Sequence, residues 1–472
     1  MTGWTRRDSA TFAALALLSG LIRIPFRSTQ IYHCDSYGLS MGALFTWTAH
    51  PPGFIGYCTL GRLVNYLLDD VNASFVIVNI VSTALATALV FALGREMFGY
   101  AVGVVAAVFF AVSIDTSYYA EVALTYAAEG ACATAAAWSA WMAISRRSPR
   151  WLLAHAAILA LGGSVRQTTL AFLLPLSLYA MWKATDRWRV RAAAFAVLCI
   201  CVLLWMVPNA RNVQKYWDQR DNVGYLQSVY DLQVRMPQYY DASVFGRVQY
   251  EDTRRRFHWP LVELAVGAWN AVHPPTAASP PEVQSATVGG AARMIRYQSA
   301  KFVCFAIFAC GLWLPFIAFG VRRLEREQRW FFALWIVPAA LFFALNHFGS
   351  WGYLLFFLGG LAVLAARGVV AAVPRRTAAI VAAIAAVQFA VFCLMRPIPE
   401  RSDRAILINT AVLQYGAPSI GMHFSRARSS AFNDDKRELP LDCVTERCLE
   451  RSIPRDFQLP PDVRPMTPLV RR

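Results

Sequence analysis

The sequence predicts an all-α polytopic membrane protein, on the basis of its composition, its apolar runs and the distribution of its charges. Hydrophobic residues make up 57% of the 472 residues and charged residues only 16%, against about 25% charged in a typical soluble domain. The mean hydropathy is +0.39. Apolar runs of roughly 17–25 residues, long enough to cross a bilayer, recur along the chain. Basic residues concentrate in the short connections between these runs.

We expect about eleven transmembrane helices. The first follows Arg6 and Arg7 and resembles a signal peptide, but no small-residue cleavage site precedes Arg23 and Pro25, so we expect it to be retained. The expected spans are 10–26, 74–93, 101–114, 123–143, 151–163, 168–183, 191–208, 298–320, 330–346, 352–370 and 376–395.

The net charge of +16 follows this topology. If the N-terminus is cytoplasmic, the connections that fall inside are the basic ones, as the positive-inside rule requires. They contain Arg6-Arg7, Arg95, Arg146 to Arg150, Lys183 to Arg191, Arg322 to Arg329 and Arg375-Arg376. Anionic lipid head groups are therefore the expected counter-charge, and no nucleic-acid partner is expected. The weak compositional signal of low Lys with high Ala and Arg favours a bacterial inner membrane.

The same topology makes 1–395 a transmembrane domain with two large extracytoplasmic loops, 27–73 and 209–297. Amphipathic helices are expected there, and Leu261 to Val272 has the apolar spacing of a helix lying on the membrane surface. The polar tail 396–472 is expected outside, as a small domain or a partly disordered extension. A disulfide between its Cys443 and Cys448 remains open.

The first outer loop carries the most informative polar residues. His33-Cys34-Asp35 follows the first span, and His50-Pro51-Pro52-Gly53 comes fifteen residues later. Charged groups beside hydrocarbon are costly, so such a cluster indicates function. The chain has neither a GxxxxGK nor an HExxH motif, so soluble nucleotide chemistry and a zincin site are not indicated.

These residues resemble motifs of the glycosyltransferase C superfamily, particularly the protein O-mannosyltransferase and aminoarabinose-transferase type, over about residues 1–395. The matching segments are Asp35, His50-Pro51-Pro52, Arg95 to Gly99, Gly163 to Arg166 and His347 to Tyr353. The resemblance implies an integral membrane glycosyltransferase that moves a sugar from a polyprenyl-phosphate carrier to a lipid, glycan or protein acceptor on the extracytoplasmic face.

Under this resemblance Asp35 is the general base of an inverting, single-displacement transfer. The alternative is that Asp35 only caps a helix running from Ser36 to about Ala49. The superfamily often has an Asp-Glu pair in this loop, and here Ser36 stands in the second position.

Four basic residues are candidates for binding the donor phosphate. His50 occupies the position where relatives place a basic residue, and Arg166, Arg211 and Lys215 lie on the same predicted face. Arginine suits phosphate because its planar guanidinium makes bidentate contacts. Alternatively, His50 ends a helix before the prolines, and any one of the others is an interfacial snorkelling residue.

Two acids and two later residues are candidates for orienting the sugar or the acceptor. Asp115 and Glu121 form a second acidic patch, with Glu129 eight residues further and therefore near the same face of a continuous helix. The alternative is a buried acid paired with an arginine. His347 and Tyr353 are candidates through the resemblance alone.

No metal or other cofactor is expected, because the spacing of His33, Asp35 and His50 matches no standard site, although a divalent ion remains an alternative. Two other functions stay open. A flippase or transporter of lipid-linked sugars would need no base, but the inverted repeats common in transporters are not visible. A non-catalytic lipid-binding relative would account for Ser36.

Overall fold

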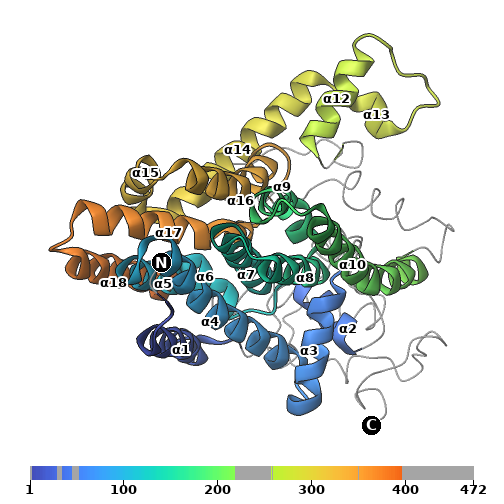
Figure 1. Cartoon of the computed structure of the whole chain (residues 1–472). Helices are drawn as coiled ribbons and strands as arrows, with labels where there is room; N and C mark the ends of the chain where they lie inside the picture. The colour runs from blue at the N-terminus through green and yellow to red at the C-terminus, as the bar shows by residue number, and fades with distance from the viewer. Residues whose placement is uncertain are drawn as a thin grey trace.

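The computed structural model describes residues 3–28, 34–44, 53–217, 257, 259–348 and 350–395, and the ordered elements within these ranges are helices without any strand. The expected all-α fold is thus confirmed for this part of the chain (Figure 1). The tail 396–472, His33, His50 and the cysteine pair Cys443 and Cys448 lie outside the described residues.

The α-helices and the short 3-10 helices, designated η, follow in chain order. They are α1 (Arg6–Leu21), η1 (Ile24–Phe26), α2 (Cys34–Leu44), α3 (Ile55–Leu68), α4 (Val71–Phe98), α5 (Tyr100–Val112), α6 (Ile114–Ala120), α7 (Tyr126–Arg146), α8 (Pro149–Val165), α9 (Gln167–Ala184), α10 (Trp188–Trp217), α12 (Pro260–Asn270), α13 (Pro281–Ser285), α14 (Val288–Cys310), η4 (Gly311–Trp313), α15 (Leu314–Arg322), α16 (Arg326–Leu345), η5 (Trp351–Leu354), α17 (Leu355–Ala372) and α18 (Thr377–Met395).

A helix coincides with each of the eleven expected spans, and helix α12 falls where the surface helix was expected. Seven helical segments among the described residues are long and apolar enough to cross a membrane, or eight if the bent pair α5 and α6 is one span. The chain is therefore an integral membrane protein. The number eleven stays a prediction. The expected span 298–320 is broken at Gly311, whose φ of +47° suits glycine.

The core of the bundle is formed by α4 and α17, which contact each other, and by α5 and α7, each of which contacts both (Figure 1). In the most apolar window of α4, 72% of the residues are buried, and in that of α17, 78%. In α1 and α10 the figure is 11%. Since helices that are apolar all round are buried or face lipid, the first pair forms the centre of the bundle and the second its lipid-facing rim.

The buried segment between α6 and α7 is not helical, and side chains from other helices satisfy its backbone. Asn79 of α4 donates to the carbonyl oxygens of Val122 (2.6 Å) and Leu124 (2.7 Å). Tyr57 of α3 donates to the oxygen of Leu124 at 3.0 Å. Non-helical backbone at membrane depth needs such partners. The break also places Glu121 and Glu129 on different helices, so the expectation of a common helix face was wrong.

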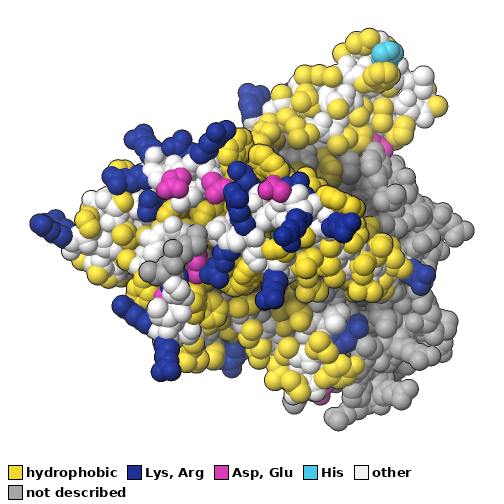
Figure 2. Space-filling view, in the orientation of Figure 1, with side chains coloured by type: hydrophobic (Ala, Val, Ile, Leu, Met, Phe, Trp, Pro, Cys, Tyr) yellow, Lys and Arg dark blue, Asp and Glu magenta, His cyan; other side chains and the backbone are white. Residues whose placement is uncertain are grey.

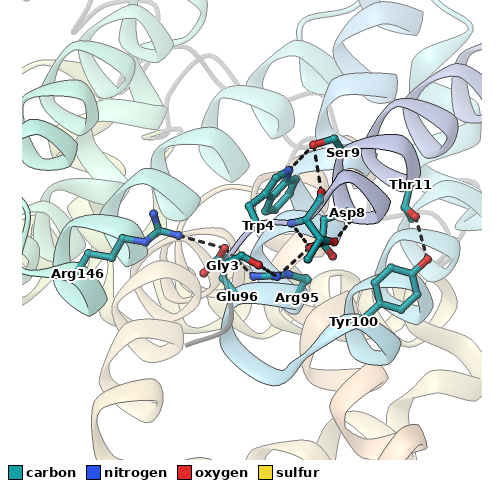
Figure 3. A network of polar contacts seen from close by, with 10 residues as sticks. Gly3, Trp4, Asp8, Ser9, Thr11, Arg95, Glu96, Tyr100 and Arg146 are labelled. Carbon is teal, nitrogen blue, oxygen red and sulfur yellow. Dashed lines mark hydrogen bonds and ion pairs between the residues drawn. The ribbon is translucent and has the colours of Figure 1, made fainter.

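Contacts between connections join segments of the same predicted face. At the N-terminal face, Arg95 binds the Asp8 carboxylate at 2.9 Å and the Gly3 carbonyl oxygen at 2.8 Å. Arg146 lies 3.3 Å from Glu96 (Figure 3). The segment Arg95 to Gly99 thus anchors the N-terminus. Figure 2 shows Lys and Arg side chains gathered across the face near α9, α15 and α16.

Candidate functional site

Arg166, in the turn between α8 and α9, is the centre of the polar cluster at the other end of the bundle. Its Nη1 lies 3.2 Å from Oε2 of Glu129. The guanidinium carbon lies 4.9 Å from the ring centre of Tyr126 and 4.6 Å from that of Tyr353. Cation–π contacts of this kind add to the ion pair when they are desolvated. Arg166 therefore links the start of α7 with the later outer loop.

The charge of Arg166 is compensated by its direct neighbours in the cluster. Burial opposes the charge of Arg166, but Glu129 and the neighbouring tyrosines outweigh it, so the pKa of the guanidinium is raised above its ordinary value. The other oxygen of Glu129 accepts a hydrogen bond from the hydroxyl of Thr168. Glu129 is therefore a buried acid paired with an arginine, as the alternative interpretation of the sequence expected.

The first outer loop is joined to the Arg166 turn directly. Gln167 donates from Nε2 to the carbonyl oxygen of Gly53 at 2.6 Å. The ring centre of Phe54 lies 6.0 Å from the guanidinium carbon of Arg166. A Cβ added to Gly56 would overlap Ser164, whose backbone carbon would lie 2.8 Å away. The segments Gly53 to Gly56 and Ser164 to Gln167, far apart in sequence, therefore meet at one place.

The later outer loop, residues 347–353, completes the cluster. The ring nitrogen Nε2 of His347 lies 2.9 Å from the hydroxyl of Tyr353. The hydroxyl groups of Ser350 and Tyr119 are 2.6 Å apart. A Cβ on Gly352 would lie 2.6 Å from the ring of Tyr126, so this close approach requires glycine. His347 and Tyr353, predicted from the resemblance alone, lie in the same cluster as Arg166.

Asp35 approaches the cluster from α2. Its side chain is half-buried, and its carboxylate interacts electrostatically with the phenol groups of Tyr126 and Tyr353. These are the two rings that cover Arg166. Asp35 lies within the first turn of α2 (Cys34–Leu44), not at an N-cap position before Ser36. The helix thus begins two residues before the expected Ser36, and the capping role of Asp35 stays an alternative.

Helix α2 is held against α3 at its other end. Arg62 of α3 donates from Nε to the carbonyl oxygen of Ala43 (2.9 Å) and from Nη2 to that of Gly42 (3.0 Å). The last carbonyl groups of a helix have no partner within the helix, and a cation there also interacts favourably with the helix dipole. Arg62 thus fixes the helix that carries Asp35.

Asp115 and Glu121 lie on α6 and at its C-cap, beside the cluster. Asp115 is fully buried, and among the described residues neither of its carboxylate oxygens has a hydrogen-bond partner. It interacts electrostatically with Tyr119, whose hydroxyl contacts Ser350. Glu121 interacts electrostatically with the buried Arg23. Asp115 is therefore connected to the cluster through Tyr119.

The remaining candidates are not joined to the cluster by the described contacts. Arg211 is exposed near the end of α10. Lys215 belongs to the same helix, but its side chain lies outside the described residues, as does His50. Within the described part of the chain, no three His, Cys, Asp or Glu side chains come close enough to hold a metal ion.

Sequence reasoning missed three residues of the cluster. Tyr126 and Gln167 are residue types that are common where a span meets the membrane surface. Thr168 is a residue type that is common in the first turn of a helix. The only signal was their neighbourhood to Arg166 and to the acidic patch. A buried arginine requires a carboxylate and further acceptors, and this requirement points to Glu129 and the residues around it.

Comparisons with known proteins concern the family and the fold of the chain. Residues 50–210 match the family model described as "Dolichyl-phosphate-mannose-protein mannosyltransferase". The structure resembles the crystal structure of ArnT from Cupriavidus metallidurans bound to undecaprenyl phosphate, with a TM-score of 0.51 and 14% sequence identity, over 90% of this chain and 75% of that chain. The chain shares its fold with this ArnT structure.

A second solved structure is similar as well. The oligosaccharyltransferase of Archaeoglobus fulgidus, tethered to an acceptor peptide, matches with a TM-score of 0.50 and 12% identity over 89% of this chain. The match covers 58% of the archaeal chain. No curated protein matches the sequence. The expected resemblance to members of the glycosyltransferase C superfamily is confirmed as a family match over residues 50–210 and as a shared fold, and at these identities the structural likeness concerns the fold alone.

Proposed function

We propose that the protein is an integral membrane glycosyltransferase that moves a sugar from a polyprenyl-phosphate donor to an acceptor on the extracytoplasmic face. The observation that supports this most strongly is the convergence of three separated segments, Gly53 to Gly56, Ser164 to Gln167 and His347 to Tyr353, around Arg166. Asp35 approaches the same tyrosines from a fourth segment. The likeness to ArnT, crystallised with undecaprenyl phosphate, supports the donor class.

In the proposed reaction the acceptor hydroxyl or amine attacks the anomeric carbon of the donor sugar. The bond from that carbon to the phosphate oxygen breaks, and polyprenyl phosphate leaves with the electron pair. The acceptor proton passes to the carboxylate of Asp35, which is the general base. One displacement inverts the configuration at the anomeric carbon.

Cations would stabilise the leaving phosphate. Arg166 keeps its positive charge although it is buried. A guanidinium has five donors, so contacts with Glu129, Thr125 and Tyr353 still leave donors for a phosphate. His50, Arg211 and Lys215 are proposed as further phosphate contacts.

Asp115, Glu121, His347 and Tyr353 are proposed to orient the sugar or the acceptor. His347 and Tyr353 support this role because they hydrogen-bond to each other beside Arg166. For Asp115, the support is a buried carboxylate without a hydrogen-bond partner among the described residues. In water-poor surroundings such a group costs free energy unless a ligand satisfies it. Ser36 is buried beside Asp35, so Asp35 is proposed to act without a second carboxylate on α2.

We further propose that the protein lies in a bacterial inner membrane, with the N-terminus in the cytoplasm and the C-terminus outside. The basic face around the N-terminus supports this orientation (Figure 2). The reaction needs no metal in this proposal.

The function is tested with the purified full chain in liposomes, using undecaprenyl-phosphate-linked mannose, glucose and galactose with a membrane-extract acceptor. Turnover should release undecaprenyl phosphate only when acceptor is present, and the product should have inverted anomeric configuration by NMR. Movement of the intact donor across the bilayer without acceptor and without turnover would instead identify a transporter. A product with retained configuration would exclude the single displacement.

A further inference from the structure

Two turns at the N-terminal face combine unusually many cations with exposed tryptophans. The α9–α10 turn, residues 182–191, contains Trp182, Lys183, Arg187, Trp188, Arg189 and Arg191. The α15–α16 turn, residues 322–330, contains Arg322, Arg323, Arg326, Arg329 and Trp330. We refer to both together as the α9–α16 basic patch. It holds eight basic residues and three acidic ones, Asp186, Glu325 and Glu327.

The two turns are adjacent in space. Nζ of Lys183 lies 3.7 Å from Oε1 of Glu327. Tyr179, one helical turn before Lys183, interacts electrostatically with both Glu327 and Arg326. Helices α9 and α16 also pack together through Phe172 and Phe342, whose ring centres are 5.2 Å apart. The basic side chains of the two turns therefore belong to one surface.

The acids of the patch neutralise only a part of this charge. Glu327 pairs with Lys183, and Asp186 lies 3.6 Å from Arg191. Arg191 also donates to the carbonyl oxygens of Met181 and Thr185, so it caps the C-terminal end of α9. Several arginines, namely Arg187, Arg189, Arg322, Arg323 and Arg326, remain exposed. The patch thus carries a net positive charge on its exposed surface.

The exposed tryptophans indicate that this positive charge lies at the bilayer surface. Trp182 is 63% exposed, Trp188 70% and Trp330 51%. Exposed tryptophans at the ends of spanning helices lie at the level of the lipid head groups. An exposed guanidinium at this depth meets phosphate groups, with which arginine makes bidentate contacts.

We infer that the α9–α16 basic patch binds the phosphodiester head groups of anionic phospholipids in the leaflet on the N-terminal side. Basic clusters between helices on this side of a membrane are typical sites for such lipids. The site is at the opposite end of the bundle from Arg166. Lipid binding there is therefore independent of the proposed sugar transfer and can be measured without donor or acceptor.

Native mass spectrometry of the full chain released from nanodiscs of phosphatidylcholine and phosphatidylglycerol, mixed three to one, tests this inference. The wild type should retain phosphatidylglycerol in excess over its share of the bilayer. The double variant Arg187→Ala/Arg326→Ala should retain about tenfold less. The matched control is Arg375→Ala/Arg376→Ala, two exposed arginines in the α17–α18 turn on the same face, and it should retain nearly as much as the wild type.

A charge-preserving variant, Arg187→Lys/Arg326→Lys, separates charge from folding and should retain most of the lipid. The inference is overturned if the wild type shows no preference for phosphatidylglycerol. It is equally overturned if the alanine variant and the control lose the same amount, or if the lysine variant loses as much as the alanine variant.

Discussion

Replacing Arg166 by alanine should destabilise the bundle far more than replacing an exposed arginine. The substitution would leave the carboxylate of Glu129 buried with the hydroxyl of Thr168 as its remaining partner. Removing one member of a buried ion pair costs about 3–5 kcal/mol, because the other charge stays uncompensated. The lost contacts with the rings of Tyr126 and Tyr353 act in the same direction, at about 0.5–2 kcal/mol each. These contributions overlap, so we expect a total of about 4 kcal/mol.

The assay is unfolding by SDS in mixed micelles, followed by circular dichroism, for Arg166→Ala, Glu129→Gln and the double variant. The double variant should be less destabilised than the sum of the single variants, with a coupling of about 2 kcal/mol. Arg211→Ala, at an exposed arginine, is the control and should stay within about 0.5 kcal/mol of the wild type. If Arg166→Ala behaves like this control, or if the two single variants are additive, the buried pair does not hold the outer segments together.

Three further predictions concern the scaffold. Because the buried His155 hydrogen-bonds to the hydroxyl of Ser177 and to the carbonyl oxygen of Ala136, each at 2.9 Å, His155→Leu should remove both contacts and lower stability by about 1–3 kcal/mol in the same assay; unchanged stability would show that these contacts contribute nothing. Gly56→Ala should destabilise by about 1–3 kcal/mol, since the new Cβ would lie 2.8 Å from the backbone carbon of Ser164, and a wild-type unfolding curve would refute the close approach. Arg62→Ala should lower kcat of the proposed transfer with little change in KM for the donor, because it loosens α2; equal loss with the Arg62→Lys variant would contradict a role that depends on the planar guanidinium.

The helical architecture was largely predictable, because each span is a run of apolar residues with basic residues at alternate ends. What composition could not provide is the course of the chain between helices. Glu121 and Glu129 are eight residues apart, about two turns of a continuous helix. In the structure, a segment that is not helical lies between them. Asn79, a lone amide inside an apolar run, makes this possible through its bonds to the carbonyl oxygens of Val122 and Leu124.

The candidate site was predictable in part, through residue types whose chemistry stands out in a membrane. Asp35 and Arg166 stand out in this way, whereas His347 and Tyr353 were candidates through the resemblance alone, and the structure brings the four to one cluster. Their partners were not identifiable, because Gln167 and its bond to Gly53 depend on which connections lie side by side. The boundaries of α2 were also misjudged. Asp35 is inside the first turn, because α2 begins at Cys34 rather than at Ser36.

The central claim is that the carboxylate of Asp35 takes the acceptor proton. The most direct measurement is single-turnover transfer from undecaprenyl-phosphate-linked sugar in liposomes by Asp35→Asn, beside Asp69→Asn. Asp69 is an exposed acid at the left-handed end of α3, where φ is +50°, and asparagine tolerates that conformation. Asp35→Asn should reduce the rate by about 10²–10⁴ with unchanged binding of undecaprenyl phosphate, while Asp69→Asn should transfer like the wild type. A correctly inserted Asp35→Asn variant that transfers within a few-fold of the wild type would contradict the claim.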